Sequence, residues 1–167
     1  MTAAILSIGT ELTRGEIVNT NASWLCEQLT ALGFEVSECA TVADDKAQIN
    51  STLERLGRIH RIIVCTGGLG PTTDDITSAC VAELLQVDLL RDEVGLAQLR
   101  ERFTRAGRTF YESNIKQLDF PKGAIILPNT QGTAPGFQIR VGSADSYFMP
   151  GVPSEMKPMF QDSVVPS

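Results

Sequence analysis

The sequence predicts an α/β protein with a mostly parallel but mixed sheet. Three apolar runs in the first half alternate with helical patterns, which is typical of parallel strands joined by right-handed crossovers. Three shorter strand patterns follow, and the last two flank a turn at residues 142–145, so the sheet becomes mixed near its end. The expected strands cover residues 3–8, 34–42, 61–66, 124–127, 136–141 and 146–149. We find neither a repeat nor a linker, and expect one domain over residues 1–167.

Each helix of the first half begins at a polar residue suited to cap it. Side-chain oxygens of Asn and Asp accept hydrogen bonds from the free N–H groups at a helix start. Gly33 ends the first helix, because glycine readily adopts the left-handed conformation found there. The expected caps are Asn21 for the first helix, Asp44 or Asp45 for the second and Asp74 for the third.

The second half predicts helices at residues 92–107 and 110–118, and Pro153 opens a final helix. One face of the helix at 92–107 carries Leu96, Leu99 and Phe103. We interpret this face as core packing, with an oligomer contact as the alternative. The chain stops soon after the final helix, and we therefore expect it to be a fragment of a longer protein.

Composition and charge exclude several classes of partner. The net charge is -6 and the basic residues are scattered, which argues against nucleic acid, because nucleic-acid binding needs a basic face. The apolar runs are too short to cross a membrane, and the N-terminus has no basic segment of a signal peptide. The four cysteines show no CxxC spacing, so we expect buried free thiols and a cytoplasmic location.

The segment that best indicates function is Thr66-Gly67-Gly68-Leu69-Gly70-Pro71-Thr72-Thr73-Asp74-Asp75-Ile76-Thr77, between a strand and a helix. Backbone N–H groups of such a turn bind anions. Two carboxylates beside an anion site make sense when a cation lies between them and a phosphate. The segment therefore predicts a phosphate-containing ligand and a divalent metal. The alternative is a tight turn followed by a capped helix.

Four further loops are expected at the same edge of the sheet, where ligands of open α/β sheets bind. Taken singly, their polar residues suit turns and caps as well as a site; together they favour a site. They cover residues 9–21, 41–46, 128–136 and 149–156. The spacing alone leaves nucleotidyl transfer and diphosphate hydrolysis open.

Several separate segments resemble one known family. The glycine segment is similar to the signature of the molybdopterin-binding domain of molybdenum cofactor biosynthesis. Its Gly-Leu-Gly-Pro-Thr form, together with residues 15–21 (GEIVNTN), 132–137 (GTAPGF) and 150–156 (PGVPSEM), resembles the N-terminal domain of the competence/damage-inducible (CinA) proteins. The resemblance covers about residues 5–160.

This resemblance implies a three-layer α/β/α fold, a homo-oligomer (dimer or trimer) and a function. The implied function is hydrolysis of ADP-ribose, or a related nucleotide diphosphate, to AMP and ribose 5-phosphate, with a divalent metal (Mg, Mn or Co). Longer members carry a C-terminal domain that deamidates nicotinamide mononucleotide, for which this chain has no room. The residues matching the relatives' metal- and nucleotide-binding aspartates are Asp44 and Asp75.

The predicted site combines this resemblance with the shared position of the loops. We predict that three aspartates act in catalysis and hold the metal, with Glu11 or Glu155 assisting. The aspartates are Asp44, Asp45 and Asp75. The predicted phosphate cradle is Gly67, Gly68, Gly70, Thr72 and Thr73. Ribose or a second phosphate is expected at Asn19, Asn21, Asn129 and Thr133, and the loop of Pro150, Gly151, Ser154 and Glu155 completes the site.

Two rival functions stay open. One is adenylyl transfer to molybdopterin, against which the added Glu155 counts, because it alters the loop that holds pterin in the relatives. The other is a nucleotide- or pterin-binding module without catalysis.

Overall fold

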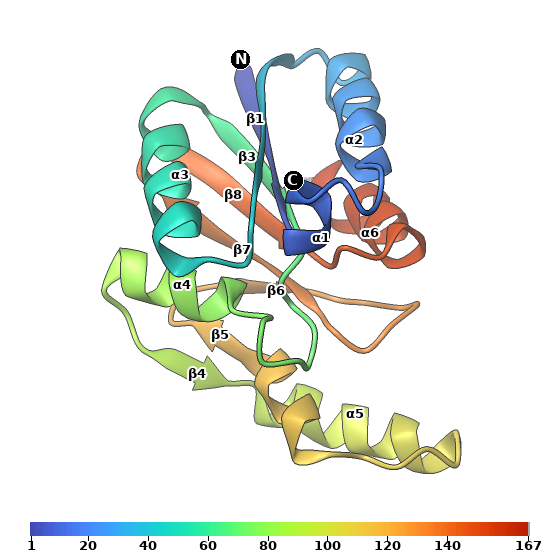
Figure 1. Ribbon diagram of the computed structural model, residues 1–167. Coiled ribbons are helices and arrows are strands. Elements are labelled where there is room, and N and C mark those ends of the chain that lie inside the picture. Colours follow the sequence, from blue (N-terminus) through green and yellow to red (C-terminus); the bar gives the residue numbers. More distant parts are fainter. Residues whose placement is uncertain (167) are drawn as a thin grey trace.

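A computed structural model describes residues 1–166 (Figure 1). The elements, in chain order, are β1 (Thr2–Ile8), α1 (Thr10–Thr13), α2 (Thr20–Ala31), β2 (Glu35–Val42), α3 (Lys46–Ile59), β3 (Ile62–Thr66), α4 (Thr77–Leu85), β4 (Leu89–Arg91), α5 (Glu93–Arg105), the 3₁₀ helix η1 (Glu112–Leu118), β5 (Asp119–Pro121), β6 (Ile125–Leu127), β7 (Gly136–Val141), β8 (Ala144–Met149), α6 (Pro153–Met159) and the π-helical η2 (Phe160–Val164).

Six strands form one mixed sheet in the order β2-β1-β3-β8-β7-β6. The first four are parallel, whereas β7 runs antiparallel to both of its neighbours. Helices α3 and α4 lie on one side of the sheet, and α2 and α6 lie on the other (Figure 1). This arrangement confirms the predicted mostly parallel, mixed sheet and the three layers.

Strand β1 shows why the sheet needs two helical layers. Its residues Ala3 to Ile8 are all buried, and alternate side chains point to opposite faces of the sheet. Leu6 packs in one hydrophobic cluster with residues of α3 and α4, and Ile5 packs in the other with residues of α2 and α6. The continuous apolar run therefore reflects burial on both faces.

A smaller antiparallel pair, β4 and β5, lies outside the main sheet together with α5 and η1 (Figure 1). The sequence prediction missed this pair, because each strand has three residues and no alternating pattern. Leu96, Leu99 and Phe103 of α5 join the cluster beside α3 and α4. Their assignment to core packing is confirmed.

The structure corrects two of the predicted helix caps. Helix α2 is capped by Asn19 and not by Asn21. The Oδ1 atom of Asn19 accepts a hydrogen bond from the backbone N–H of Ala22 at 3.1 Å. Helix α4 begins after Ile76 without a side-chain cap, so the assignment to Asp74 is wrong. The Asp45 cap of α3 is confirmed, since its Oδ1 accepts from the N–H of Gln48 at 2.9 Å.

Two turns of the chain contain glycines with positive φ angles. Gly33 follows α2 with φ +85°, as predicted. The β7–β8 turn is tighter than expected: Val141 pairs with Ala144, so only Gly142 and Ser143 lie in it and β8 takes the rest of the predicted segment. Gly142 has φ +59°, a conformation that glycine favours.

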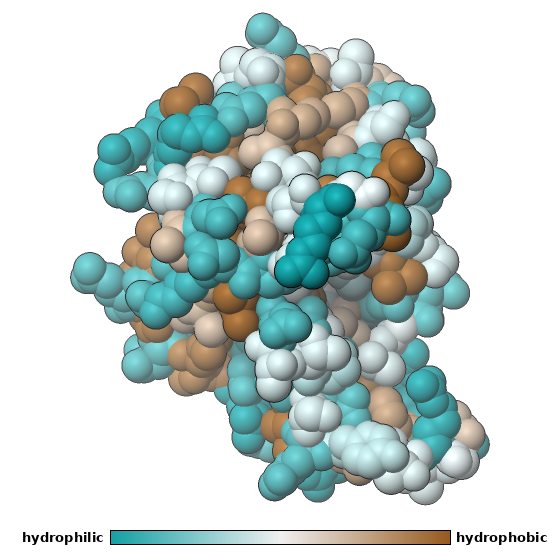
Figure 2. Space-filling model, in the orientation of Figure 1, coloured by the Kyte–Doolittle hydropathy of each residue, from teal (hydrophilic) through white to brown (hydrophobic). Residues whose placement is uncertain are grey.

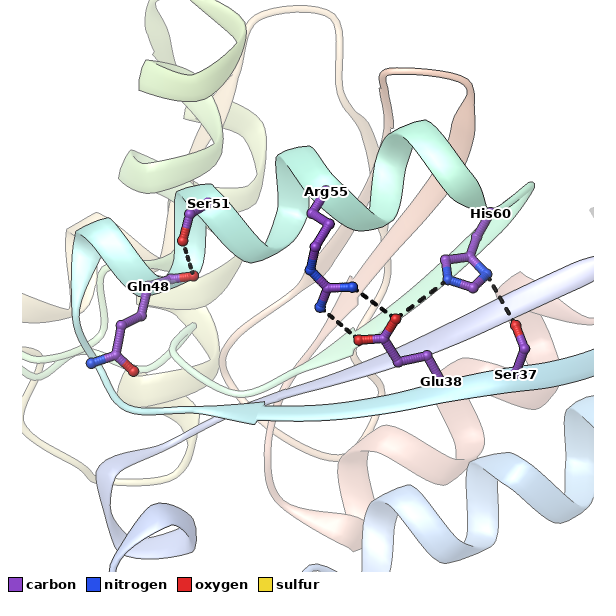
Figure 3. A network of polar contacts seen from close by, with 6 residues as sticks. All are labelled: Ser37, Glu38, Gln48, Ser51, Arg55 and His60. Atoms are coloured by element: carbon purple, nitrogen blue, oxygen red, sulfur yellow. Dashed lines mark hydrogen bonds and ion pairs between the residues drawn. The ribbon is translucent and has the colours of Figure 1, made fainter.

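A polar network joins α3 to the edge strand β2 (Figure 3). The guanidinium of Arg55 donates to both carboxylate oxygens of Glu38, at 2.8 and 2.6 Å. The Nε2 atom of His60 lies 3.8 Å from the same carboxylate, and its Nδ1 atom lies 3.4 Å from the hydroxyl of Ser37. Arg55 lowers the pKa of Glu38 by hydrogen bonding to its charged form.

The cysteines are free, but they are not all buried. Cys65 and Cys80 are buried, Cys26 is half-buried and Cys39 is exposed, which corrects the expectation of four buried thiols. The Sγ atoms of Cys26 and Cys39 lie 3.2 Å apart. Desolvation and this neighbour raise the pKa of Cys39 to about 12, so the thiol keeps its proton at neutral pH.

Hydrophobic residues are scattered over the face shown in Figure 2, without one dominant apolar patch. Among residues 1–166, no helix combines the length and the hydropathy that a membrane span requires.

Candidate functional site

A cavity of about 970 Å³ lies at the carboxyl edge of the main sheet. Its volume is within the range of ligand pockets, roughly 300–1,000 Å³. The loops after β1, β2, β3 and β8 all contribute to its lining, as does the loop after β6. Because β6 and β8 are both antiparallel to β7, β6 ends at the same edge. The topology therefore explains why the loop at residues 128–135 reaches the cavity.

The glycine segment makes a turn that other residues could not adopt. Gly67 and Gly68 have φ values of +105° and +68°. A Cβ atom on Gly67 would lie 2.0 Å from the carbonyl oxygen of Ile8, and one on Gly68 would lie 2.1 Å from the hydroxyl of Thr77. The turn therefore packs too closely against β1 and α4 for any side chain at these two positions.

The same turn presents free hydrogen-bond donors. The N–H of Gly67 donates to the carbonyl of Met149 at 3.0 Å, so it is not available to a ligand. In contrast, the N–H groups of Gly68, Leu69 and Gly70 donate to no acceptor in the described part of the chain. All three residues line the cavity. Consecutive free N–H groups in a turn are the kind of donors that bind anions in proteins.

Two aspartates of the cavity are held in the same way, each by a threonine. The Oδ2 atom of Asp44 accepts from the backbone N–H and the hydroxyl of Thr10, at 2.8 and 2.9 Å. The Oδ2 atom of Asp75 accepts from the backbone N–H and the hydroxyl of Thr72, at 2.9 and 2.7 Å. Within residues 1–166 the Oδ1 atom of each aspartate accepts no hydrogen bond. Each carboxylate is therefore fixed in orientation and keeps one oxygen for a ligand.

Gly70 makes room for one of these carboxylates. A Cβ atom at this position would lie 2.6 Å from the Oδ2 atom of Asp75. The free N–H of Gly70 and the Asp75 carboxylate are thus neighbours on the cavity wall.

The cavity lining is strongly acidic. Its charged residues are Glu11, Glu16, Asp44, Asp74, Asp75 and Glu155, against Arg14. Six carboxylates and one guanidinium give the lining a negative charge that repels a bare phosphate.

The donor set fits a cation that the ligand helps to bind. Among residues 1–166 there is no group of three or more His, Cys, Asp or Glu side chains that could hold a metal ion. Mg²⁺, however, usually takes one or two carboxylates together with phosphate oxygens of the substrate and water. Asp44 and Asp75 both line the cavity and are each held by a threonine, so they are the residues that could hold such an ion.

Most of the predicted site residues do line the cavity. Those present are Glu11, Asn19, Asn21, Asp44, Gly67, Gly68, Gly70, Thr72, Asp75, Thr133, Pro150, Gly151 and Glu155. Some of their polar groups are already engaged. The side-chain oxygen of Asn19 caps α2, and its Nδ2 atom lies 3.4 Å from the hydroxyl of Thr41.

Four predicted site residues lie outside the lining: Asp45, Thr73, Asn129 and Ser154. The Asp45 carboxylate caps α3 instead of facing a metal. The side chain of Asn129 is used within its own loop, where its oxygen accepts from the N–H groups of Gln131 and Gly132. Its nitrogen donates to the carboxylate of Glu155 at 2.7 Å. Asn129 therefore positions Glu155 and is not available to a ribose.

The cavity also includes residues that were not assigned to the site from the sequence, among them Thr10, Arg14 and Gln117. Thr10 has a signal in the sequence, since it lies in the polar segment that follows β1; its hydrogen bond to Asp44 joins it to the loop after β2. Gln117 has none. It belongs to η1, and its place beside Thr133 depends on how the segment that contains α5 packs against the main sheet.

Comparison with known proteins identifies the family. Residues 4–167 match a family described as a probable molybdopterin binding domain. The crystal structure of a CinA protein of unknown function from Thermoplasma acidophilum has a TM-score of 0.89 and 31% identity, covering 99% of this chain and 96% of that one. The chain belongs to the molybdopterin-binding domain family and, within it, to the CinA proteins.

Other relatives extend the comparison. A CinA-like protein of Anaeromyxobacter dehalogenans is 44% identical over 167 residues, and a putative competence-damage inducible protein of Clostridium botulinum (strain Loch Maree) is 42% identical over 166 residues. Each match covers 99% of this chain but 41% of the relative, so the chain spans less than half of their length.

The fold extends to enzymes of cofactor synthesis. The crystal structure of the molybdopterin biosynthesis enzyme MoaB from Thermus thermophilus has a TM-score of 0.62 and 22% identity, covering 99% of this chain and 89% of that one. At this identity the likeness concerns the fold alone.

Proposed function

We propose that the cavity binds a nucleotide diphosphate together with a divalent metal ion (Mg²⁺, Mn²⁺ or Co²⁺), and that the chain hydrolyses it. ADP-ribose is the proposed substrate, and AMP and ribose 5-phosphate are the products. One observation carries the proposal: three free backbone N–H groups at residues 68–70 share a cavity with the threonine-held carboxylates of Asp44 and Asp75.

The glycine turn supplies the phosphate-binding part. The N–H groups of Gly68, Leu69 and Gly70 have no acceptor in the described chain, and phosphate oxygens are acceptors. Gly68 and Gly70 carry no side chain that would keep a phosphate away from the backbone. A diphosphate would therefore lie against this turn.

The two aspartates supply the metal-binding part. A divalent ion held there would neutralise the diphosphate and withdraw charge from the phosphorus under attack. Thr10 and Thr72 fix the orientation of the carboxylates before the ligand arrives, which reduces the cost of ordering them on binding.

Hydrolysis also requires a water molecule and an acceptor for its proton. Water attacks one phosphorus, the bridging P–O bond breaks, and the proton of the water passes to a base. The carboxylates of Glu11 and Glu155 line the cavity and are available as this base. The hydrogen bond from Asn129 orients Glu155 for the role.

A product assay tests this function. ADP-ribose is incubated with the chain, with and without Mg²⁺, Mn²⁺ or Co²⁺, and AMP is quantified by chromatography. We expect metal-dependent release of AMP and a loss of about a hundredfold or more in rate for Asp75→Asn, because a neutral amide no longer binds the metal. The matched control is Asp162→Asn, on the exposed part of η2, which should keep the wild-type rate. A wild-type rate for Asp75→Asn would refute the metal assignment.

A second candidate function is favoured by the family itself, whose description is molybdopterin binding. In that case the cavity would bind a pterin, and the protein would either only bind it or transfer AMP from ATP to the pterin. Formation of an adenylylated pterin without ADP-ribose cleavage would favour transfer. Thermal stabilisation by a nucleotide or pterin without turnover would favour a binding module.

A further inference from the structure

Two cysteine thiols lie in contact between helix α2 and the edge strand β2. Cys26 belongs to α2 and Cys39 to β2, and their Sγ atoms are 3.2 Å apart. Neither residue lines the cavity. Cys39 is exposed and Cys26 is half-buried, whereas Cys65 and Cys80 are buried. The pair therefore offers solvent an accessible thiol that has a second thiol directly beside it.

The packing of the fold fixes the two backbones that carry these thiols. Helix α2 buries Leu25 and Leu29 in the hydrophobic cluster on its side of the sheet. Strand β2 pairs with β1 from its first to its last residue. Alternate side chains of a strand point to opposite faces, so Glu38 reaches α3 (Figure 3) while Cys39 faces Cys26 of α2. The contact between the two thiols is thus a consequence of the layer arrangement.

The separation of the sulfur atoms is close to that of a covalent bond. A disulfide joins sulfur atoms about 2.05 Å apart, so the two Sγ atoms must approach by about 1 Å from their present 3.2 Å. Rotation about the Cα–Cβ bonds moves the sulfur atoms while the backbone stays in place. The bond can therefore form without separating α2 from β2.

We propose that Cys26 and Cys39 are an oxidative modification site, at which hydrogen peroxide or a related peroxide converts the two thiols into an intramolecular disulfide. This inference goes beyond the proposed function and does not depend on it. Cys39 is the residue attacked first, because it is the exposed member of the pair. Cys26 is the resolving thiol.

The reaction takes two steps. In the first, the Cys39 thiolate attacks one oxygen of the peroxide, the O–O bond breaks, and Cys39 becomes a sulfenic acid; the departing hydroxide takes up a proton and leaves as water. In the second, the sulfur of Cys26 attacks the Cys39 sulfur, the S–S bond forms, the S–O bond breaks, and a second water leaves with the thiol proton. Two thiols lose two electrons and two hydrogen atoms, and the peroxide is reduced to two waters.

The neighbouring thiol determines the fate of the oxidised cysteine. A sulfenic acid without a partner is oxidised further to a sulfinic acid, which is irreversible, whereas a disulfide is reduced by thiols. Desolvation and the neighbouring thiol raise the pKa of Cys39 to about 12, so the thiolate is scarce at neutral pH and the first step is slow. The site would therefore respond to prolonged exposure to peroxide and protect Cys39 from permanent damage.

The test maps the cysteines after oxidation. The full chain is incubated with hydrogen peroxide at mildly alkaline pH, free thiols are alkylated under denaturing conditions, and peptides are identified by mass spectrometry without reduction. Cys26→Ala removes one thiol of the pair, and Cys80→Ala is the matched control, since it removes a thiol outside the pair. The melting temperature of each protein is measured before and after oxidation.

We expect wild type and Cys80→Ala to yield one pair of peptides linked through Cys26 and Cys39, in a chain lighter by two hydrogen atoms, with Cys65 still alkylated. Dithiothreitol should restore both thiols. Oxidation should raise the melting temperature of these two proteins by about 5 °C or more, because the disulfide restricts the unfolded chain. In Cys26→Ala no such link should form, the melting temperature should not rise, and dithiothreitol should not recover all of the Cys39 thiol.

Three results would overturn the inference, and none of them would affect the proposed function. In the first, Cys26 and Cys39 of the oxidised wild type are both still alkylated. In the second, the link joins two chains or involves Cys65 or Cys80. In the third, oxidation lowers the melting temperature of the wild type, which would show that the native backbone does not accommodate the bond.

Discussion

At the residue scale, the site depends on backbone positions that allow no side chain. Gly68 combines a left-handed φ with a Cβ position 2.1 Å from the hydroxyl of Thr77. That hydroxyl in turn donates to the carbonyl of Gly67 at 3.0 Å, so the turn and the first residue of α4 form one unit. The glycines are thus required by the fold, and the free N–H groups of the turn are a consequence of its shape.

Gly68→Ala tests this requirement. We expect it to lower the free energy of unfolding by about 1–3 kcal/mol from backbone strain and to lower it further through the clash with Thr77. Gly33→Ala is the matched control, since Gly33 also has a positive φ but would place its Cβ in open space. Urea denaturation of the two variants measures the difference, and equal losses would contradict the packing argument.

The residue scale also shows which predictions the sequence can support. The glycine turn indicated Asp74 and Asp75 together, and the family resemblance singled out Asp75, which lies beside Gly70. Asp45 follows Asp44 directly in the sequence and carries the same carboxylate, yet the carboxylate of Asp45 caps α3. Adjacent aspartates point in different directions, and the sequence does not state which one faces the cavity.

At the element scale, the long and regular elements were predictable because their apolar periods reflect burial. The strands β1 and β3 and the helices α2 and α3 follow this rule. Apolar periods do not predict the pair of strands β4 and β5 or the position of η1, because these features depend on long-range packing. Gln117 was missed for the same reason.

The contact between β2 and α3 offers a test at this scale (Figure 3). Arg55 holds the pKa of Glu38 below its usual value of 4.5. A lowered carboxyl pKa in the folded state contributes stability above the unfolded pKa, and this stability is lost as the pH falls through the folded pKa. We therefore expect Glu38→Gln to be less stable than wild type at pH 7, and the difference to shrink as the pH falls below 4.5 and through the lowered folded pKa.

Urea titrations at pH 7 and at a series of pH values below 4.5 measure this effect. Glu54→Gln is the control, because Glu54 pairs with Arg58 within α3 and joins no second element. At pH 7, Glu54→Gln should lower the free energy of unfolding by less than Glu38→Gln does. A difference between wild type and Glu38→Gln that stays the same throughout the acidic series would contradict the account.

At the scale of the whole molecule, the mixed sheet gathers five loops at one edge, and together they line one acidic cavity. No loop forms the site alone: the turn after β3 offers the N–H donors, while Asp44 comes from the loop after β2 and Glu155 from α6. The central claim is that this combination binds a diphosphate through a metal held by Asp44 and Asp75.

The most direct test is a calorimetric titration of the protein with a methylene-bridged ADP-ribose, an analogue that cannot be hydrolysed, in the presence and in the absence of Mg²⁺. We expect Mg²⁺ to strengthen binding to the wild-type chain by about tenfold or more, which corresponds to about 1.4 kcal/mol. In the double variant Asp44→Asn/Asp75→Asn, this gain should fall below about twofold. An equal gain from Mg²⁺ in the two proteins, or wild-type binding that does not respond to the metal, would contradict the claim.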